Sequence, residues 1–168
     1  MREYKKIDKT AEAIGGGECL IRLLCTPLYY DEMTHQVNPD AFDLRLLGKN
    51  QEQKEYFVSF FRKGKFADED SFLSALHVGY DIWDKKPWET NSFFGYGTFV
   101  CQDALDVNSM IEIWPLLGSD VHIGMFYAKS DDEYYSGPLP KDNPEILEML
   151  TDLADLITDT VEKAPEKC

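Results

Sequence analysis

The sequence predicts an α+β domain, with a mostly antiparallel sheet of about five or six strands, one inserted helix and a C-terminal amphipathic helix packed on the sheet. Apolar, aromatic and β-branched runs recur along the chain and are typical of strands. Only one segment between them has helical spacing, which leaves little room for the crossovers that parallel strands need. The predicted strands are Cys19–Cys25, Tyr56–Arg62, Phe93–Cys101, Met110–Trp114 and Val121–Tyr127.

The length and composition indicate one folded domain. The chain has 168 residues, 43% of them hydrophobic and 13% aromatic, which is enough to form a packed core. Residues 1–17 are polar and end in three glycines, so we expect a flexible N-terminal arm, a single globular domain over 18–163 and a frayed tail at 164–168. The N-terminus has no apolar core of the kind that signal peptides contain, and no run is long enough for a transmembrane helix.

Individual residues indicate where the strands lie in the sheet and where they end. The first run is apolar on both faces apart from Arg22, which is typical of a central strand, and Pro27 ends it. Gly95 and Gly97 alternate in the third run and indicate a bulge or a close approach by another backbone or a ligand. The last two runs flank a short loop containing Pro115 and Gly118, which predicts a hairpin.

Two segments have helical patterns. Apolar residues recur at spacings of three and four from Asp68 to Trp83, and Asp68 or Asp70 can cap the helix. The last helix begins after Asn143, a capping residue, with Pro144 at the first helical position. It has one apolar and one acidic stripe. The apolar stripe comprises Ile146, Met149, Leu150, Leu153, Leu156, Ile157 and Val161.

The charge of the chain limits its partners. Its formal net charge is −14, from 17 basic and 31 acidic residues, which disfavours nucleic acid and anionic membrane surfaces. Residues 129–168 hold 4 basic and 11 acidic residues, a net of 4 − 11 = −7. The acidic stripe of the last helix is either an ordinary solvent face or a binding face for a basic protein partner. Its candidate partner-binding residues are Glu148, Asp152, Asp155 and Asp159.

Metal and cofactor motifs are absent from the sequence. The cysteines are Cys19, Cys25, Cys101 and Cys168, and no two of them have Cys-x-x-Cys spacing. The three histidines are scattered, and there is no phosphate loop or dinucleotide fingerprint. We therefore expect no metal and no cofactor, and cysteines used in this way fit the cytoplasm.

Three polar residues inside apolar runs are candidate ligand-binding residues. Arg22 could clamp a carboxylate or phosphate, or could pair with an acid for a structural purpose. Ser59 could act as a nucleophile if a base lay nearby, or could be a core serine bonded to backbone. His122 could serve as a base or donor, or could be an ordinary strand residue whose bonds are satisfied.

The order of several short motifs gives a resemblance. Leu-Ile-Arg22-Leu is followed by Val37-Asn-Pro-Asp-Ala-Phe42, Val58-Ser59, Phe72-Leu73, Gly97-Thr-Phe-Val and His122-Ile-Gly. In this order the chain resembles a loose group of small bacterial proteins of unassigned function, which look like accessory components of conflict or toxin loci. Here Tyr-Phe-Val-Ser-Phe-Phe stands where the group has Leu-Ser-Val, and the long acidic helix is not part of the pattern. The resemblance implies a context and no chemistry.

Two main hypotheses follow from the sequence. The absence of a catalytic motif, the charge and the acidic helix favour a non-enzymatic, immunity-like accessory protein that engages a basic protein. The alternative is a nucleotide-type ligand binder or an ADP-ribosyl-transfer-like enzyme, with Arg22 on a phosphate and Ser59 on a ribose. It requires Arg22, Ser59 and His122 to converge on one cleft. The aromatic stretch Trp83–Tyr96 is either a recognition surface, for instance in a homodimer, or core.

Overall fold

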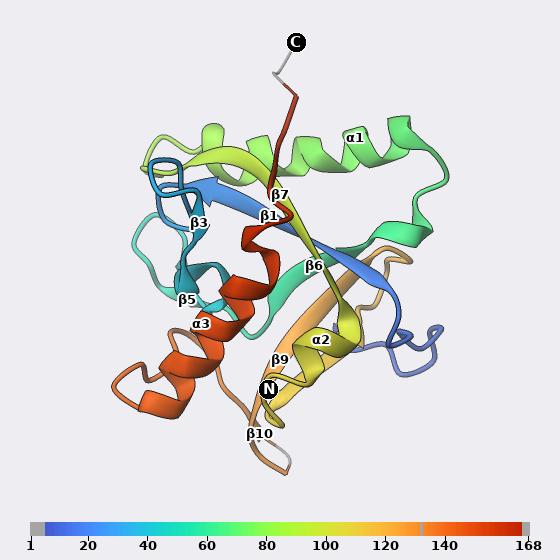
Figure 1. Ribbon diagram of the computed structural model, residues 1–168, viewed down its shortest axis with the longest axis vertical. Coiled ribbons are helices and arrows are strands. Elements are labelled where there is room, and N and C mark those ends of the chain that lie inside the picture. Colours follow the sequence, from blue (N-terminus) through green and yellow to red (C-terminus); the bar gives the residue numbers. More distant parts are fainter. Residues whose placement is uncertain (1–5, 132, 166–168) are drawn as a thin grey trace.

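A computed structural model describes residues 6–131 and 133–165 and has the predicted α+β fold with a mostly antiparallel sheet (Figure 1). Over these residues, seven strands form the main sheet in the order β10-β9-β6-β1-β7-β11, and β8 also pairs with β9. The strands are β1 (Cys19–Thr26), β6 (Val58–Arg62), β7 (Ser92–Val100), β8 (Ile111–Pro115), β9 (His122–Ser130), β10 (Glu133–Tyr134) and β11 (Glu162–Lys163).

The remaining elements are short strand pairs and helices. β2 (Tyr30–Asp31) pairs with β3 (Gln36–Val37), and β4 (Leu46–Leu47) pairs with β5 (Gln53–Lys54). The helices are α1 (Glu69–Gly79), which continues as the π-helical turn η4 (Tyr80–Asp84), α2 (Cys101–Leu105), α3 (Pro144–Thr158) and two 3₁₀ turns, η2 (Pro39–Phe42) and η3 (Lys63–Lys65).

Helices α1 and α3 lie on opposite faces of the sheet. Successive side chains of a strand point to opposite faces. In β7 the ring of Tyr96 meets that of Phe72 in α1, 5.1 Å away, whereas the next residue, Gly97, lies against Ile157 of α3. The main core therefore forms between the sheet and α3, and the site described below lies on the α1 face.

The predicted caps and the predicted hairpin are confirmed. The side chain of Asp68 accepts a hydrogen bond from the Ser71 backbone, and that of Asn143 accepts one from Glu145. The hairpin is β8 paired with β9. The chain departs from the strand prediction at Cys101, which begins the short helix α2 instead of ending β7.

The glycines of β7 allow two close approaches. A Cβ at Gly95 would lie 2.0 Å from the carbonyl oxygen of Glu162 in β11, and a Cβ at Gly97 would press on Ile157. The approach expected from the alternating glycines is thus made by backbone and by a helix side chain. In the aromatic stretch around them, Trp83 and Phe93 are buried in the core while Trp88 is exposed.

Both ends of the chain contact the sheet where they are described. Ile7 forms a β-bridge with Leu116. The buried side chain of Arg62 donates to the Ala13 carbonyl and forms an ion pair with Glu18, with 2.7 Å between Nη2 and Oε2. The contacts of Ile7 and Ala13 fall within the expected N-terminal arm, and the Ala164 backbone N–H donates to β7 within the expected tail. Residues 1–5 of the arm and 166–168 of the tail lie outside the described residues.

Candidate functional site

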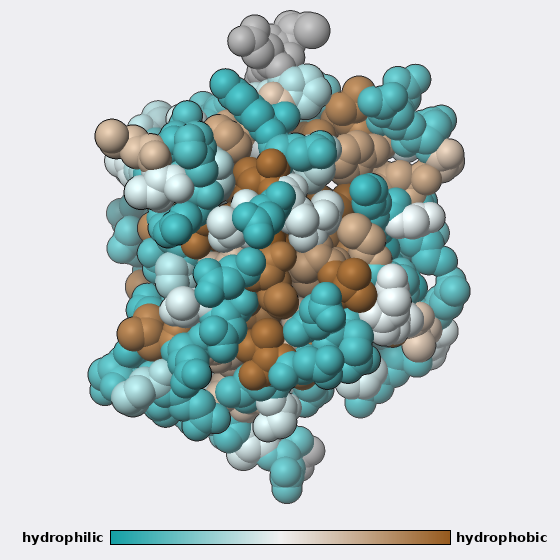
Figure 2. All heavy atoms as spheres, viewed as in Figure 1, coloured by the Kyte–Doolittle hydropathy of each residue, from teal (hydrophilic) through white to brown (hydrophobic). Residues whose placement is uncertain are grey.

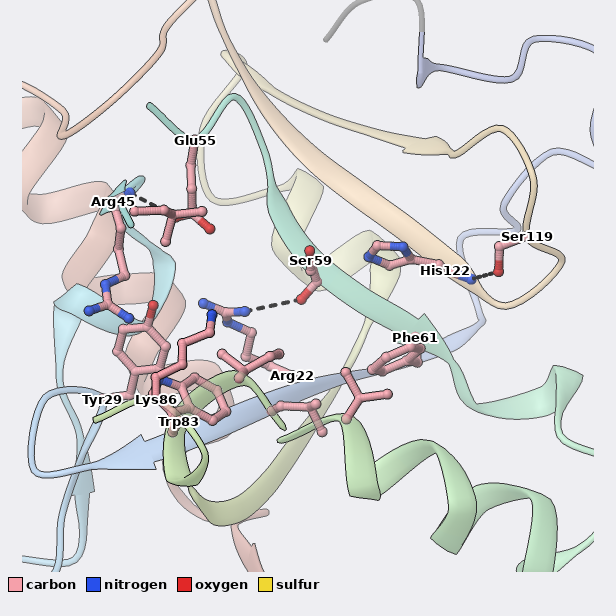
Figure 3. A pocket seen from close by; sticks show the side chains of 14 residues that line it. Arg22, Tyr29, Arg45, Glu55, Ser59, Phe61, Trp83, Lys86, Ser119 and His122 are labelled. Carbon is pink, nitrogen blue, oxygen red and sulfur yellow. Dashed lines mark hydrogen bonds between the residues drawn. The ribbon is translucent and has the colours of Figure 1, made fainter. Parts of the chain in front are cut away.

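A cavity of about 500 Å³ lies on the α1 face, beside the point where β1 and β6 part (Figure 3). The two strands pair only through Leu20–Ile21 of β1, although β1 continues to Thr26. The side chains that line the cavity come from β1, β4, β6, α1, η4, β9 and the loops between elements. They belong to Arg22, Leu23, Tyr29, Arg45, Leu47, Glu55, Ser59, Phe61, Val78, Ile82, Trp83, Lys86, Ser119 and His122.

Arg22 spans the gap between the parted strands. Because Arg22 is paired with Gly97, its side chain leaves β1 on the α3 side of the sheet. The side chain of Ser59 leaves β6 on the α1 side. The guanidinium donates from Nε to the Ala41 carbonyl at 2.8 Å and from Nη1 to the Ser59 carbonyl at 3.2 Å. No carboxylate of the described residues lies within 4 Å of it, so its structural partners are backbone oxygens and not the acid that the sequence suggested. With two nitrogens engaged, only Nη2 has no acceptor among the described residues.

Tyr29 is the centre of the cationic end of the cavity. Its ring centroid lies 4.9 Å from Cζ of Arg22 and 5.7 Å from Cζ of Arg45, which are cation–π distances. The ring of Trp83 meets it edge-on at 5.9 Å. Burial raises the pKa of the Tyr29 phenol to about 12, so the hydroxyl stays protonated at neutral pH. Tyr29 thus places two cations and a neutral phenol around one end.

Trp83 has a buried donor without a partner. Its side chain is 3% exposed, and its indole Nε1 has no hydrogen-bond partner among the described residues. A buried polar group left unpaired costs about 1–3 kcal/mol, so such a group needs an explanation. Figure 3 shows Trp83 with Tyr29, Lys86 and Arg22 at one end of the cavity, while Phe61, His122 and Ser119 lie at the other.

The cationic end is positively charged overall. Arg22, Arg45 and Lys86 line the cavity, and Glu55 is the only carboxylate among the described residues that line it. Burial raises the pKa of Glu55, although the charge of Arg22 opposes this, and its Oε1 accepts a hydrogen bond from the Arg45 backbone at 2.7 Å. Arg45 also lies 3.5 Å from the Glu89 carboxylate. The cavity is therefore locally cationic although the whole chain has a net charge of −14.

His122 lies at the opposite end and is uncharged at neutral pH. Its ring contacts Phe61 and Phe57, with centroids 5.6 and 6.2 Å apart. Burial, and then the nearby charge of Lys6, lower the pKa of His122. The neutral imidazole can donate or accept a hydrogen bond there but does not add a charge. No described residue hydrogen-bonds the hydroxyl of Ser59, so the geometry provides no activated nucleophile.

The structure therefore brings together the three residues that sequence reasoning singled out for a ligand. Arg22, Ser59 and His122 line one cavity, as the ligand hypothesis requires. The guanidinium of Arg22 is not available for bidentate binding of an anion, because two of its nitrogens already donate to backbone carbonyls. The acidic residues of α3 are exposed and line none of the cavities described here.

Sequence reasoning missed most of the cationic end. Tyr29, Arg45, Glu55 and Lys86 lie in segments between predicted elements, and Trp83 was included only in helical periodicity and an aromatic run. The alternation from Ala41 to Leu47 could have placed Arg45 on one face, but nothing local indicated what it faces. These residues meet through contacts between distant parts of the chain.

Comparisons with protein-family models, with curated proteins and with solved structures returned no match for this chain. Within residues 6–131 and 133–165, no helix combines the length and the apolar character needed to cross a bilayer. No group of three or more His, Cys, Asp or Glu in the same residues is placed to hold a metal ion.

The raised pKa of Glu55 predicts a pH-dependent effect of Glu55→Gln. A carboxyl whose pKa is higher in the folded state stabilises the fold below its ordinary pKa of 4.5, and that stabilisation is lost as pH rises through the folded value. Glutamine stays neutral, so the variant should gain stability relative to the parent between about pH 4 and about pH 8. Denaturant unfolding at both pH values measures this. Exposed Glu52→Gln on the same hairpin should show no such trend, and a gain that shrinks with pH would contradict the assignment.

Proposed function

We propose that this chain is a small-molecule binding protein whose ligand carries an anionic group, held at the cationic end of the cavity. The observation that carries the proposal is the set of three cationic side chains, Arg22, Arg45 and Lys86, that line one cavity of a chain with net charge −14. The cavity volume of about 500 Å³ falls within the range of roughly 300–1,000 Å³ that is typical of ligand sites.

The lining residues suggest a role for each polar group. Nη2 of Arg22 is a donor that no described residue satisfies. The Tyr29 hydroxyl adds a second donor, and Lys86 adds charge at the edge. An anionic acceptor satisfies donors and charges together, which neither water nor a neutral ligand does equally well.

Binding is better supported than catalysis. Nucleophilic catalysis needs a base within hydrogen-bond reach of the nucleophile, and the Ser59 hydroxyl has no such partner among the described residues. Of the two sequence-based alternatives, the ligand binder is therefore retained and the transferase is not carried further. A nucleotide remains one anionic ligand to test.

Dye binding tests the proposal. 1-Anilinonaphthalene-8-sulfonate carries one sulfonate, and N-phenyl-1-naphthylamine is its neutral analogue, so the ratio of their affinities measures recognition of the charge. We expect the sulfonate to bind more tightly and Lys86→Ala to weaken it by about threefold, as for one partly exposed ion pair. Fluorescence titration measures both affinities.

The matched control is Lys85→Ala, the adjacent exposed lysine, which lines no cavity described here and pairs with Asp81. It should leave both affinities unchanged. Equal losses in the two variants, equal affinities for the charged and neutral dyes, or no saturable binding would overturn the proposal.

A second candidate function rests on α3. The acids Glu148, Asp152 and Asp155 of α3 and its C-cap residue Asp159 are exposed at spacings of four, three and four residues, and no described cation lies within 4 Å of them. Figure 2 shows hydrophilic side chains over most of the face that carries α3. An immunity-like protein that engages a basic partner could use such a stripe, and the resemblance to small proteins of bacterial conflict loci motivates it.

Salt-dependent capture tests this candidate. The immobilised chain should retain a basic protein from bacterial lysate at about 50 mM salt and lose it at about 500 mM, since screening shortens the reach of exposed charges. Neutralising the four α3 acids to their amides should abolish capture. Neutralising four scattered exposed acids, Glu32, Glu52, Asp70 and Asp103, is the control with equal net charge, and equal losses in both variants would sink the idea.

A further inference from the structure

The cavity also has an apolar part that continues to the surface through the exposed side chains of Val78 and Ile82. Its aliphatic and phenyl lining consists of Leu23, Leu47, Phe61, Val78 and Ile82. From these residues and the cationic end we infer that the ligand is an amphipathic carboxylic acid. Its carboxylate lies at Nη2 of Arg22 in the cationic end, and its apolar chain runs along Val78 and Ile82 toward the surface. This inference rests on the proposed function and adds the class of ligand.

Three lining residues at intervals of four have a polarity that complements such a ligand. Val78, Ile82 and Lys86 follow one another along α1, η4 and the residues after them, and all three line the cavity. Val78 and Ile82 lie on the helical segment, and Lys86 lies two residues after the end of η4. Because all three line the cavity, this segment presents two apolar side chains followed by a cation, which matches an apolar chain that ends in an acid.

The mouth of the cavity exposes apolar side chains that a ligand would cover. Leu47, Val78 and Ile82 are 37%, 42% and 37% exposed, and each lines the cavity. Trp88, 46% exposed, lines an adjoining hollow that shares Leu47, Ile82 and Lys86 with the cavity. We call these four residues the apolar rim. Clustered exposed hydrophobic residues mark binding sites, whereas single ones need no explanation.

The donors at the cationic end suit a carboxylate better than a phosphate. Arg22 offers one free nitrogen and not a fork, because Nε and Nη1 bind carbonyls. A carboxylate monoanion can accept from the free nitrogen of Arg22, whereas a phosphate dianion would place more charge beside Glu55.

Competition against the bound sulfonate dye tests the class of ligand. The competitors are decanoate, hexanoate, decanol and adenosine monophosphate. We expect decanoate to displace the dye at a concentration at least about tenfold lower than hexanoate, because each buried methylene adds affinity. Decanol, which has the chain without the charge, should be weaker than decanoate, and the nucleotide should not compete.

A pair of exposed apolar residues supplies the matched variants. Ile82→Ser at the apolar rim should weaken decanoate by about threefold or more and leave hexanoate nearly unchanged, since the longer chain reaches the rim. Leu147→Ser on α3, 45% exposed and away from the cavity, should change neither. Both positions are partly exposed, so both variants should fold.

The outcomes separate the inference from the proposed function. Displacement by adenosine monophosphate but not by decanoate would keep the anion-binding function and overturn the carboxylic acid. Displacement by decanol as strongly as by decanoate, or an equal effect of Ile82→Ser on both acids, would also overturn it. If the dye affinities depended neither on the charge of the dye nor on Lys86, the proposed function itself would be overturned.

Discussion

The two hydrogen bonds from the Arg22 guanidinium to the backbone carbonyls of Ala41 and Ser59 determine the rest of this architecture. The bond to Ser59 of β6 lies where β1 and β6 stop pairing, which is where strand carbonyls lose their ladder partners, and the bond to Ala41 joins β1 to η2. A guanidinium is long and planar enough to replace such a partner from the neighbouring strand, and its charge strengthens both bonds. The sheet can therefore open at this point without leaving the Ser59 carbonyl oxygen unsatisfied.

The opening produces the cavity and its chemistry. Because Arg22 fills the gap from the α3 side, the space on the α1 side is left to Tyr29, Trp83 and the apolar side chains of α1 and η4. The same residue brings positive charge into an otherwise acidic protein, and Tyr29 is packed against it at cation–π distance. Structure and candidate function thus depend on one side chain, which explains why a charged residue lies inside an apolar strand.

The sequence was informative where local rules decide the structure. Asp68 and Asn143 cap helices because their side chains reach backbone N–H groups a few residues away, and the alternating glycines of β7 marked a close approach that any Cβ would prevent. Arg22 was recognised as unusual from its apolar neighbours alone. Its backbone partners were not predictable, because Ala41 and Ser59 are 19 and 37 residues away along the chain.

The unpredicted parts share one physical cause. Trp83 looked like an ordinary apolar position of a helix, and only its burial without an acceptor distinguishes it. Arg62 read as the end of a strand, yet it binds Glu18 and holds the N-terminal segment against the sheet. In each case the informative contact joins segments that are distant in sequence, and periodicity contains no information about such contacts.

The unfolding free energy of Arg22→Lys tests the central claim most directly. Lysine keeps the positive charge but cannot bond two carbonyls in one plane, so the account predicts a loss of about 2–3 kcal/mol, as for hydrogen bonds from a charged donor. Arg45→Lys, which keeps a cation beside Glu89 in the same cavity, should lose clearly less. A parent-like stability for Arg22→Lys, or equal losses in the two variants, would contradict the view that Arg22 holds the parted strands together.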